Sequence, residues 1–260
     1  MIKLTLLVKT HSIHQSKQIE EALNAPFGDL KVEAKILDPI AGGWVQGGFE
    51  GEDENIAATY AINEFGVCPG SIDSLKQMTV IKGYITDFER THETLTVDVG
   101  IFKPKIAHAA IPLRHLQTQL IEGRNIPLKK IAEIYGLCED LPLEIKVTNF
   151  GENVSGIKAL LSDDQVKRFQ TWQASLLDRL VILGLSLQDI KNILKYERLD
   201  RDIIDIEALG LLEHALTCKL GTDAAGLIPR IGKKVRRAKF AVFNPKKILS
   251  VGCSIPQVIK

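Results

Sequence analysis

The clearest candidate for chemistry in the sequence is a glycine-spaced turn that follows an apolar segment. The turn runs from Gly221 to Gly226, includes Thr222, and leads into a helical pattern of apolar residues. Glycines let the backbone approach a ligand, and N–H groups at a helix start point outward, so the arrangement is typical of an anion-binding turn. The same spacing suits a tight strand-to-helix turn that needs glycine only for a positive φ. Both interpretations stay open from the turn alone.

The turn matches no established phosphate-binding motif. It fits neither G-x-x-x-x-G-K-[ST] nor G-x-G-x-x-G, and Lys233 lies well past the second glycine. The sequence also carries no nucleophile elbow, kinase signature or metallohydrolase motif. We therefore predict no catalytic residue and no cofactor. An enzyme that acts on a phosphorylated small molecule at the Gly221–Gly226 turn is kept as an alternative.

Basic residues surround the turn. The segment 219–247 holds nine Lys and Arg residues against a single Asp, although the whole chain has a net charge of only +1. Leu227, Ile231 and Val235 recur at helical spacing and should face a core, which leaves the cations toward water. These cations are Lys219, Arg230, Lys233, Lys234, Arg236, Arg237, Lys239, Lys246 and Lys247. A surface of one sign favours polyanion binding through counterion release, with solubilising charge or an acidic protein partner as alternatives.

Metal-binding residue types are not clustered in the sequence. The four cysteines, at positions 68, 138, 218 and 253, form no C-x-x-C pair, and His11 and His14 have no acidic or cysteine partner nearby. Structural zinc needs thiolates or imidazoles close together, so we predict no metal site and free thiols in a reducing cytoplasm. A carboxylate-rich run from Glu197 alternates with Arg198 and Arg201, which indicates surface ion pairs rather than acid–base catalysis.

The elements that carry these residues indicate an α+β protein of several domains. Residues 1–70 follow the order strand, helix, strand, strand, helix, which suggests a ferredoxin-like sandwich. Residues 77–161 show five short strands with a helical insertion before the fourth, which fits an OB-like β-barrel. Such barrels bind single-stranded nucleic acid with aromatic and cationic side chains, for which Tyr84, Lys103 and Lys105 are the candidates.

The last third of the sequence begins with a helical pattern. Ser162 and Gln165 form a capping box, and apolar residues continue at helical spacing until Gly184. Ser186 starts a second helix, so we predict a helical hairpin over 162–200 and a small basic α/β domain over 201–260. The hairpin also resembles a helix-turn-helix, which makes a DNA-binding, transcription-associated factor the second hypothesis.

Two stretches of the chain resemble a known family. The segments GEDENIAATYAINEFG and LGLLEHALTCKLGTDAAGLIPRIGKKVRRAKFAVFNP are similar to an archaeal family known only as a domain of unknown function. The similarity covers most of the chain and implies an archaeal, cytosolic protein with no assigned enzyme activity and no defined catalytic residues. The order of barrel, helices and α/β domain also resembles, as a layout, the alpha subunit of archaeal translation initiation factor 2, although the N-terminal domain is additional.

Together these patterns predict a non-enzymatic RNA-binding factor of the information-processing machinery. The expected partner is RNA or a ribosomal particle, with DNA and an acidic protein as alternatives. The longest apolar segment is too short to cross a membrane, so we expect a cytoplasmic protein without a membrane partner. The sequence does not decide between a monomer and a homodimer formed through the N-terminal domain.

Overall fold

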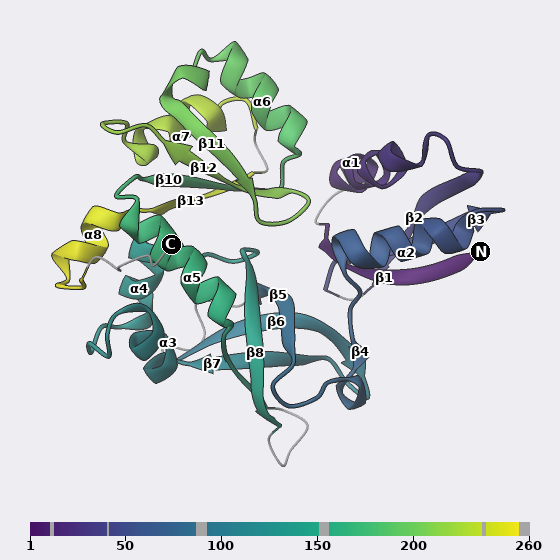
Figure 1. Ribbon diagram of the computed structural model, residues 1–260, viewed down its shortest axis with the longest axis horizontal. Helices are drawn as coiled ribbons and strands as arrows, with labels where there is room; N and C mark the ends of the chain where they lie inside the picture. The colour runs from purple at the N-terminus through teal and green to yellow at the C-terminus, as the bar shows by residue number, and fades with distance from the viewer. Residues whose placement is uncertain (11–12, 41, 87–92, 151–155, 236–237, 255–260) are drawn as a thin grey trace. The chain divides into compact units, whose positions relative to one another are not determined.

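The computed structural model describes residues 1–10, 13–40, 42–86, 93–150, 156–235 and 238–254 (Figure 1). Two compact units make up the chain. The N-terminal unit comprises Met1–Leu75 and Gly100–Ile106, and the main unit comprises Lys76–Val99 and Ala107–Lys260. The fold is mixed α+β, as the order of sequence patterns predicts.

The N-terminal unit is a ferredoxin-like sandwich with a reduced last strand. Its elements are β1 (Ile2–Lys9), α1 (Ile13–Asn24), η1 (Ala25–Phe27), β2 (Val32–Ile40), β3 (Trp44–Gly51), α2 (Glu54–Phe65), β4 (Gly70–Ser71) and η2 (Ile72–Ser74). The sheet order is β1-β3-β2, with antiparallel pairs. A single antiparallel bridge from Leu6 to Val67 continues the sheet beyond β1, where a fourth strand would lie in this topology. Trp44 and Phe49 fill its core.

The main unit begins with a closed five-stranded barrel, which confirms the predicted OB-like domain. The barrel strands are β5 (Val80–Thr86), β6 (Thr94–Lys103), β7 (Ala107–Pro112), β8 (Pro142–Phe150) and β9 (Ile157–Leu161). Strand β6 continues past Val99 into the segment that is counted with the N-terminal unit. They are hydrogen-bonded in the order β6-β5-β8-β9-β7, and β7 returns to β6. Helices α3 (Leu113–Leu120) and α4 (Leu128–Tyr135) lie between the third and fourth barrel strands, where we predict an insertion.

Side-chain alternation explains why these segments form barrel strands. In β6, Leu95 and Val97 are buried, whereas Thr94 and Thr96 are partly exposed. Gly83 allows β5 to approach β6 closely, because a Cβ at this position would lie 2.6 Å from the backbone oxygen of Asp98. The barrel therefore depends on a small residue as well as on an apolar interior.

The predicted helical hairpin over 162–200 is wrong. Helix α5 (Asp163–Ala174) is followed by a strand, β10 (Arg179–Leu183), so the two helices of the expected hairpin are not adjacent in sequence. All five residues of β10 are buried. A strand that is apolar at nearly every position matches a helical period as well as a strand period, and this match caused the error. The helix-turn-helix hypothesis loses its basis with the hairpin.

The end of α5 is set by interactions that periodicity does not reveal. Leu176 has a left-handed backbone with φ of 55°, which an α-helix cannot continue through. The buried Arg179 guanidinium donates hydrogen bonds to the backbone oxygens of Trp172 and Leu177 and to the Ser175 hydroxyl. Basic side chains at a helix C-terminus satisfy its last carbonyls in this way.

The C-terminal part of the main unit is a second ferredoxin-like sandwich. After β10 come α6 (Leu187–Tyr196), η3 (Asp200–Asp202), β11 (Ile203–Ala208), β12 (Glu213–Cys218), α7 (Ala224–Gly232), β13 (Lys239–Phe243) and α8 (Pro245–Ser250). The sheet order β11-β12-β10-β13 is antiparallel throughout. The expected α/β domain over 201–260 is thus an antiparallel sandwich whose sheet already begins at Arg179, because β10 is a central strand.

Both faces of this sheet are covered (Figure 1). On one face, Leu180, Ile182 and Leu216 pack with the apolar sides of α6 and α7. On the other face, the buried Phe243 contacts aromatic rings from the barrel side. Its centroid lies 5.7 Å from that of Tyr135 in α4, and 6.3 Å and 5.2 Å from those of Phe169 and Trp172 in α5. This aromatic cluster joins the barrel's helices to the sheet.

We predict that Phe243→Ala destabilises the protein by about 3–5 kcal/mol, because it removes the ring at the centre of the aromatic cluster and leaves a cavity. Urea unfolding followed by tryptophan fluorescence measures the change. Leu220→Ala is the matched control, since Leu220 is 81% exposed and should change the free energy of unfolding by less than about 0.5 kcal/mol. Equal effects of the two variants would contradict this account of the core.

The acid sensitivity of the sheet should depend on His214 of β12. Burial lowers the pKa of His214 to about 4. The unfolded chain, with a histidine pKa of about 6.5, then binds the proton more readily than the folded chain. The contribution to stability is complete above pH 6.5 and is lost as the pH falls toward 4, by at most about 3 kcal/mol.

We therefore predict that His214→Gln reduces the loss of unfolding free energy between pH 7 and pH 4.5. Urea titrations at both pH values provide the measurement. The exposed His115→Gln is the control and should keep the wild-type difference between the two pH values. A His214→Gln variant with the wild-type difference would show that protonation of His214 is not resisted by the fold.

Candidate nucleic-acid interface

The predicted basic residues do not form one continuous surface. Among the described residues they separate into three groups: Arg230, Lys233 and Lys234 at the C-terminal end of α7, Lys219 and Lys246 near its N-terminal end, and Lys239 and Lys247 beside α4. Arg236 and Arg237 lie outside the described residues. The expectation of a single exposed face is therefore wrong, because α7 and its neighbouring strand direct these side chains to different places.

The group at the C-terminal end of α7 adjoins the C-terminal end of α6. The Arg230 guanidinium donates a hydrogen bond to the backbone oxygen of Glu197, and its Nε lies 3.9 Å from a Glu197 carboxylate oxygen. Lys234 Nζ lies 3.8 Å from the other carboxylate oxygen and 4.2 Å from the ring centroid of Tyr196. One acid is thus shared between two cations.

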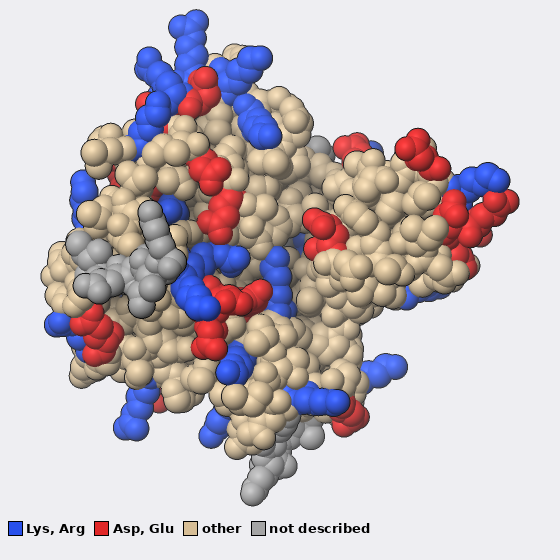
Figure 2. All heavy atoms as spheres, in the orientation of Figure 1, with Lys and Arg blue, Asp and Glu red and all other residues tan. Residues whose placement is uncertain are grey.

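Further cations from α6 and the residues that follow it extend this surface. Six basic residues and one aromatic residue, all exposed, form what we call the α6–α7 surface: Lys191, Lys195, Tyr196, Arg198, Arg230, Lys233 and Lys234. Figure 2 shows Lys and Arg side chains gathered at the top of the view, over the part that Figure 1 labels α6. The sequence analysis did not include Lys191, Lys195 or Tyr196 among the binding residues, and it assigned Arg198 to surface ion pairs.

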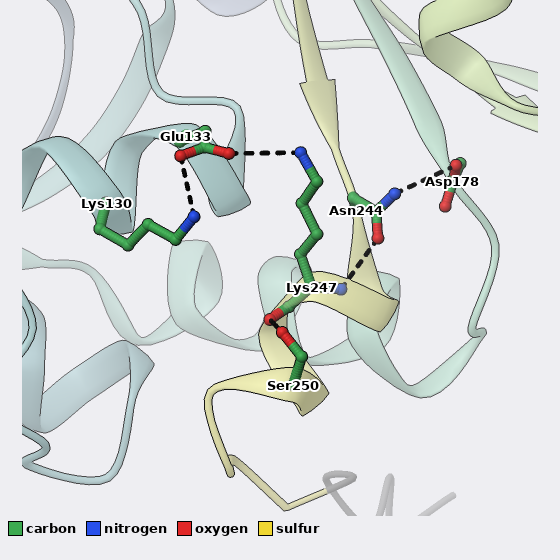
Figure 3. A network of polar contacts seen from close by, with 6 residues as sticks. All are labelled: Lys130, Glu133, Asp178, Asn244, Lys247 and Ser250. Atoms are coloured by element: carbon green, nitrogen blue, oxygen red, sulfur yellow. Dashed lines mark hydrogen bonds and ion pairs between the residues drawn. The ribbon is translucent and has the colours of Figure 1, made fainter.

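The group beside α4 is neutralised by acids. Lys239 Nζ lies 2.8 Å from a Glu139 carboxylate oxygen and 2.6 Å from one of Asp140. Lys247 Nζ lies 3.3 Å from Glu133, which also pairs with Lys130 (Figure 3). These contacts attach β13 and α8 to the segment around α4. Lys239 and Lys247 therefore have a structural role that the sequence prediction of phosphate binding did not anticipate.

A pocket of about 240 Å³ lies at the glycine turn. It is lined by Leu176, Leu177, Asp178, Lys219, Leu220, Gly221, Thr222, Asp223, Asn244 and Lys246. Gly221 has φ of +89°, so the turn itself requires this glycine. Two lysines make the pocket partly basic, but two carboxylates lie in the same wall.

Those two carboxylates accept hydrogen bonds from the backbone amides that we expected to bind an anion. The Asp223 side chain accepts a hydrogen bond from the Ala225 N–H at 3.1 Å, as the N-cap of α7. Asp178 is hydrogen-bonded to the Ala224 backbone, and burial raises the pKa of the Asp178 carboxyl. The prediction that Gly221, Thr222 and Gly226 cradle an anion is therefore wrong at the helix start, because its N–H groups already have internal acceptors.

The barrel residues proposed for nucleic-acid contact are also placed differently from our expectation. Tyr84 is only 1% exposed and cannot stack on a base, so this prediction is wrong. Lys103 and Lys105 are exposed and belong to the N-terminal unit. On the barrel strands β6 and β7, His108 Nδ1 lies 3.7 Å from the buried Asp98 carboxylate. This part of the barrel offers an acid and an imidazole rather than a row of cations.

Two further features are absent from the described part of the chain. No group of three or more His, Cys, Asp or Glu side chains there is placed to hold a metal ion. No helix there has both the length and the apolar character needed to cross a membrane.

Comparison with protein families identifies the chain at the level of its domains. Residues 75–173 match the DUF2110 central domain, and residues 177–243 match the DUF2110 C-terminal domain. The two matches cover more than half of the chain, so the protein belongs to the DUF2110 family, a family of unknown function, as the resemblance of its sequence predicts. The unmatched residues between the two domains, 174–176, include Leu176, whose left-handed backbone conformation lies between α5 and β10. No curated protein matches the chain.

Proposed function

We propose that this DUF2110 protein is a non-enzymatic RNA-binding factor that holds phosphates on the α6–α7 surface. The observation that supports the proposal is a set of exposed cations beside an exposed aromatic ring. Lys191, Lys195 and Lys233 have no ion pair with any residue that the structure describes. Their charges are thus available to an external polyanion, whose bound counterions they would release.

Because both faces of the sheet are covered, we place the RNA contact on the helices. Four-stranded sheets of this topology can bind RNA by stacking bases on an open face. Here, Phe243 and the rings of Tyr135, Phe169 and Trp172 occupy the face opposite α6 and α7. The outer surface of α6 and α7 is the part of the sandwich that combines exposure with basic charge.

The alternatives have less support from the geometry. An enzyme acting on a phosphorylated small molecule at the glycine turn would bring the phosphate against Asp178 and Asp223, and like charges repel. A DNA-binding factor based on a helical hairpin lacks its hairpin. RNA is the partner we propose, either free or within a ribosomal particle of the translation machinery.

We predict that Lys195→Gln combined with Lys233→Gln weakens RNA binding and its salt dependence. Fluorescence anisotropy with a labelled single-stranded RNA at several salt concentrations measures both. Loss of two phosphate contacts should reduce the slope of log K against log salt by roughly 1 to 1.5. Binding at low salt should fall by about tenfold or more.

The matched control is Lys219→Gln combined with Lys246→Gln, which removes the same charge from the pocket at the other end of α7. This variant should bind RNA nearly as well as the wild type, because Asp178 and Asp223 line the same pocket as the two lysines and make it unfavourable for a phosphate. Equal losses in both double variants would indicate a general charge effect and contradict a localised α6–α7 site. Wild-type protein that binds an acidic polypeptide but no RNA would favour a protein partner instead.

A further inference from the structure

Tyr196 is an unusual aromatic residue in this protein. It is 73% exposed, whereas Tyr60, the next most exposed ring in the described residues, is 38% exposed. Tyr60 makes edge contacts with Phe27 and Phe65, with centroids 5.5 Å and 6.5 Å away. Tyr196 has no comparable ring contact in the described part of the chain. Its apolar surface is therefore presented to solvent beside a basic side chain, Lys234.

The orientation of the Tyr196 ring is supported from one side. Lys234 Nζ lies 4.2 Å from the ring centroid, at a distance typical of a cation–π contact. Lys234 is in turn held by Glu197 at 3.8 Å. Because the lysine covers one face and the residue is still mostly exposed, the opposite ring face is open to a planar ligand.

Polar amides lie on the same side of α6 as the ring. Gln188, Asn192 and Tyr196 are spaced four residues apart, which places them in one row along the helix. Gln188 Nε2 donates a hydrogen bond to Asn192 Oδ1 at 3.0 Å, so the Asn192 amide nitrogen keeps its own N–H donors. A row that ends in an aromatic ring and offers amide donors can contact both the face and the edge of a nucleobase.

Cations flank this row. Lys191 and Lys195 lie one helical turn apart on the neighbouring side of α6, and both are exposed. On the other helix, Arg230 lies in the last turn of α7 with its Nε 3.9 Å from a Glu197 carboxylate oxygen, and the exposed Lys233 directly follows the helix. Phosphates on either side of a bound base would thus meet positive charge.

We infer that the α6–α7 surface selects unpaired RNA by stacking one base on the open face of Tyr196, while the flanking lysines hold the adjacent phosphates. This inference rests on the proposed RNA-binding function and names its substrate class. A base within a duplex is stacked on both neighbours and presents no free face. An unpaired base in a loop, bulge or end does, and aromatic side chains bind it with little sequence preference.

The test compares Tyr196→Ala and Tyr196→Phe in the full chain against a single-stranded ten-nucleotide RNA and a duplex RNA of equal length. Tyr196→Ala should weaken binding to the single strand by roughly 5- to 100-fold and leave duplex binding within about twofold of the wild type. Tyr196→Phe keeps the stacking surface and should bind nearly as well as the wild type. Circular dichroism checks that each variant is folded.

A second readout reports stacking directly. A single strand with 2-aminopurine at its centre should lose fluorescence on binding the wild type and Tyr196→Phe, because stacking quenches this base. Tyr196→Ala at saturating concentration should not produce the same loss.

The results separate the inference from the function on which it rests. If Lys195→Gln with Lys233→Gln weakens binding but Tyr196→Ala does not, the protein binds RNA through phosphates and the stacking inference is wrong. Equal wild-type affinity for single-stranded and duplex RNA would also overturn it. If the wild type binds neither RNA, the proposed function fails as well.

Discussion

The arrangement of the main unit depends on the packing of the C-terminal sheet against the barrel's helices. Phe243 lies fully buried among Tyr135, Phe169 and Trp172, and such aromatic contacts contribute beyond the area they bury. This packing removes one face of the sheet from solvent. It also fixes which side of the sandwich stays exposed, since α6 and α7 cover the opposite face and turn their polar sides outward. A ligand that binds the surface of this sandwich would therefore meet helices rather than the open face of a sheet.

Ion pairing then decides which of the many cations remain available. Lys239 and Lys247 are engaged by Asp140, Glu139 and Glu133, so they join β13 and α8 to the segment around α4. The lysines at the glycine turn share their pocket with two carboxylates that serve α7. At the other end of α7, the Glu197 carboxylate is shared between Arg230 and Lys234. Although the segment 219–247 holds many basic residues, only a few of them are available to a ligand. These few form the α6–α7 surface together with residues of α6, which lies some forty residues earlier in the sequence.

The sequence predicts helices and strands correctly where one side of the element faces solvent, because apolar and polar residues then alternate with a clear period. The barrel strands are examples, because Leu95 and Val97 alternate with Thr94 and Thr96. It fails at β10, whose residues are buried on both faces and so carry no distinguishing period. Of the candidate site, Arg230, Lys233 and Lys234 could be predicted from charge and helical spacing. The partners of Lys239 and Lys247 could not, since they lie about 100 residues away in the chain. Tyr196 was also missed, because an aromatic residue in an amphipathic helix is usually part of a core.

If the protein binds RNA as proposed, the RNA contacts the outer side of α6 and α7. Photo-crosslinking of the wild-type protein to a 4-thiouridine-containing single-stranded RNA, with the crosslinked peptides identified by mass spectrometry, tests it most directly. We expect crosslinks concentrated in the peptides that contain Lys195, Tyr196 and Lys233. Crosslinks confined to the barrel strands β6 and β7, or to the pocket at Gly221, would contradict the claim.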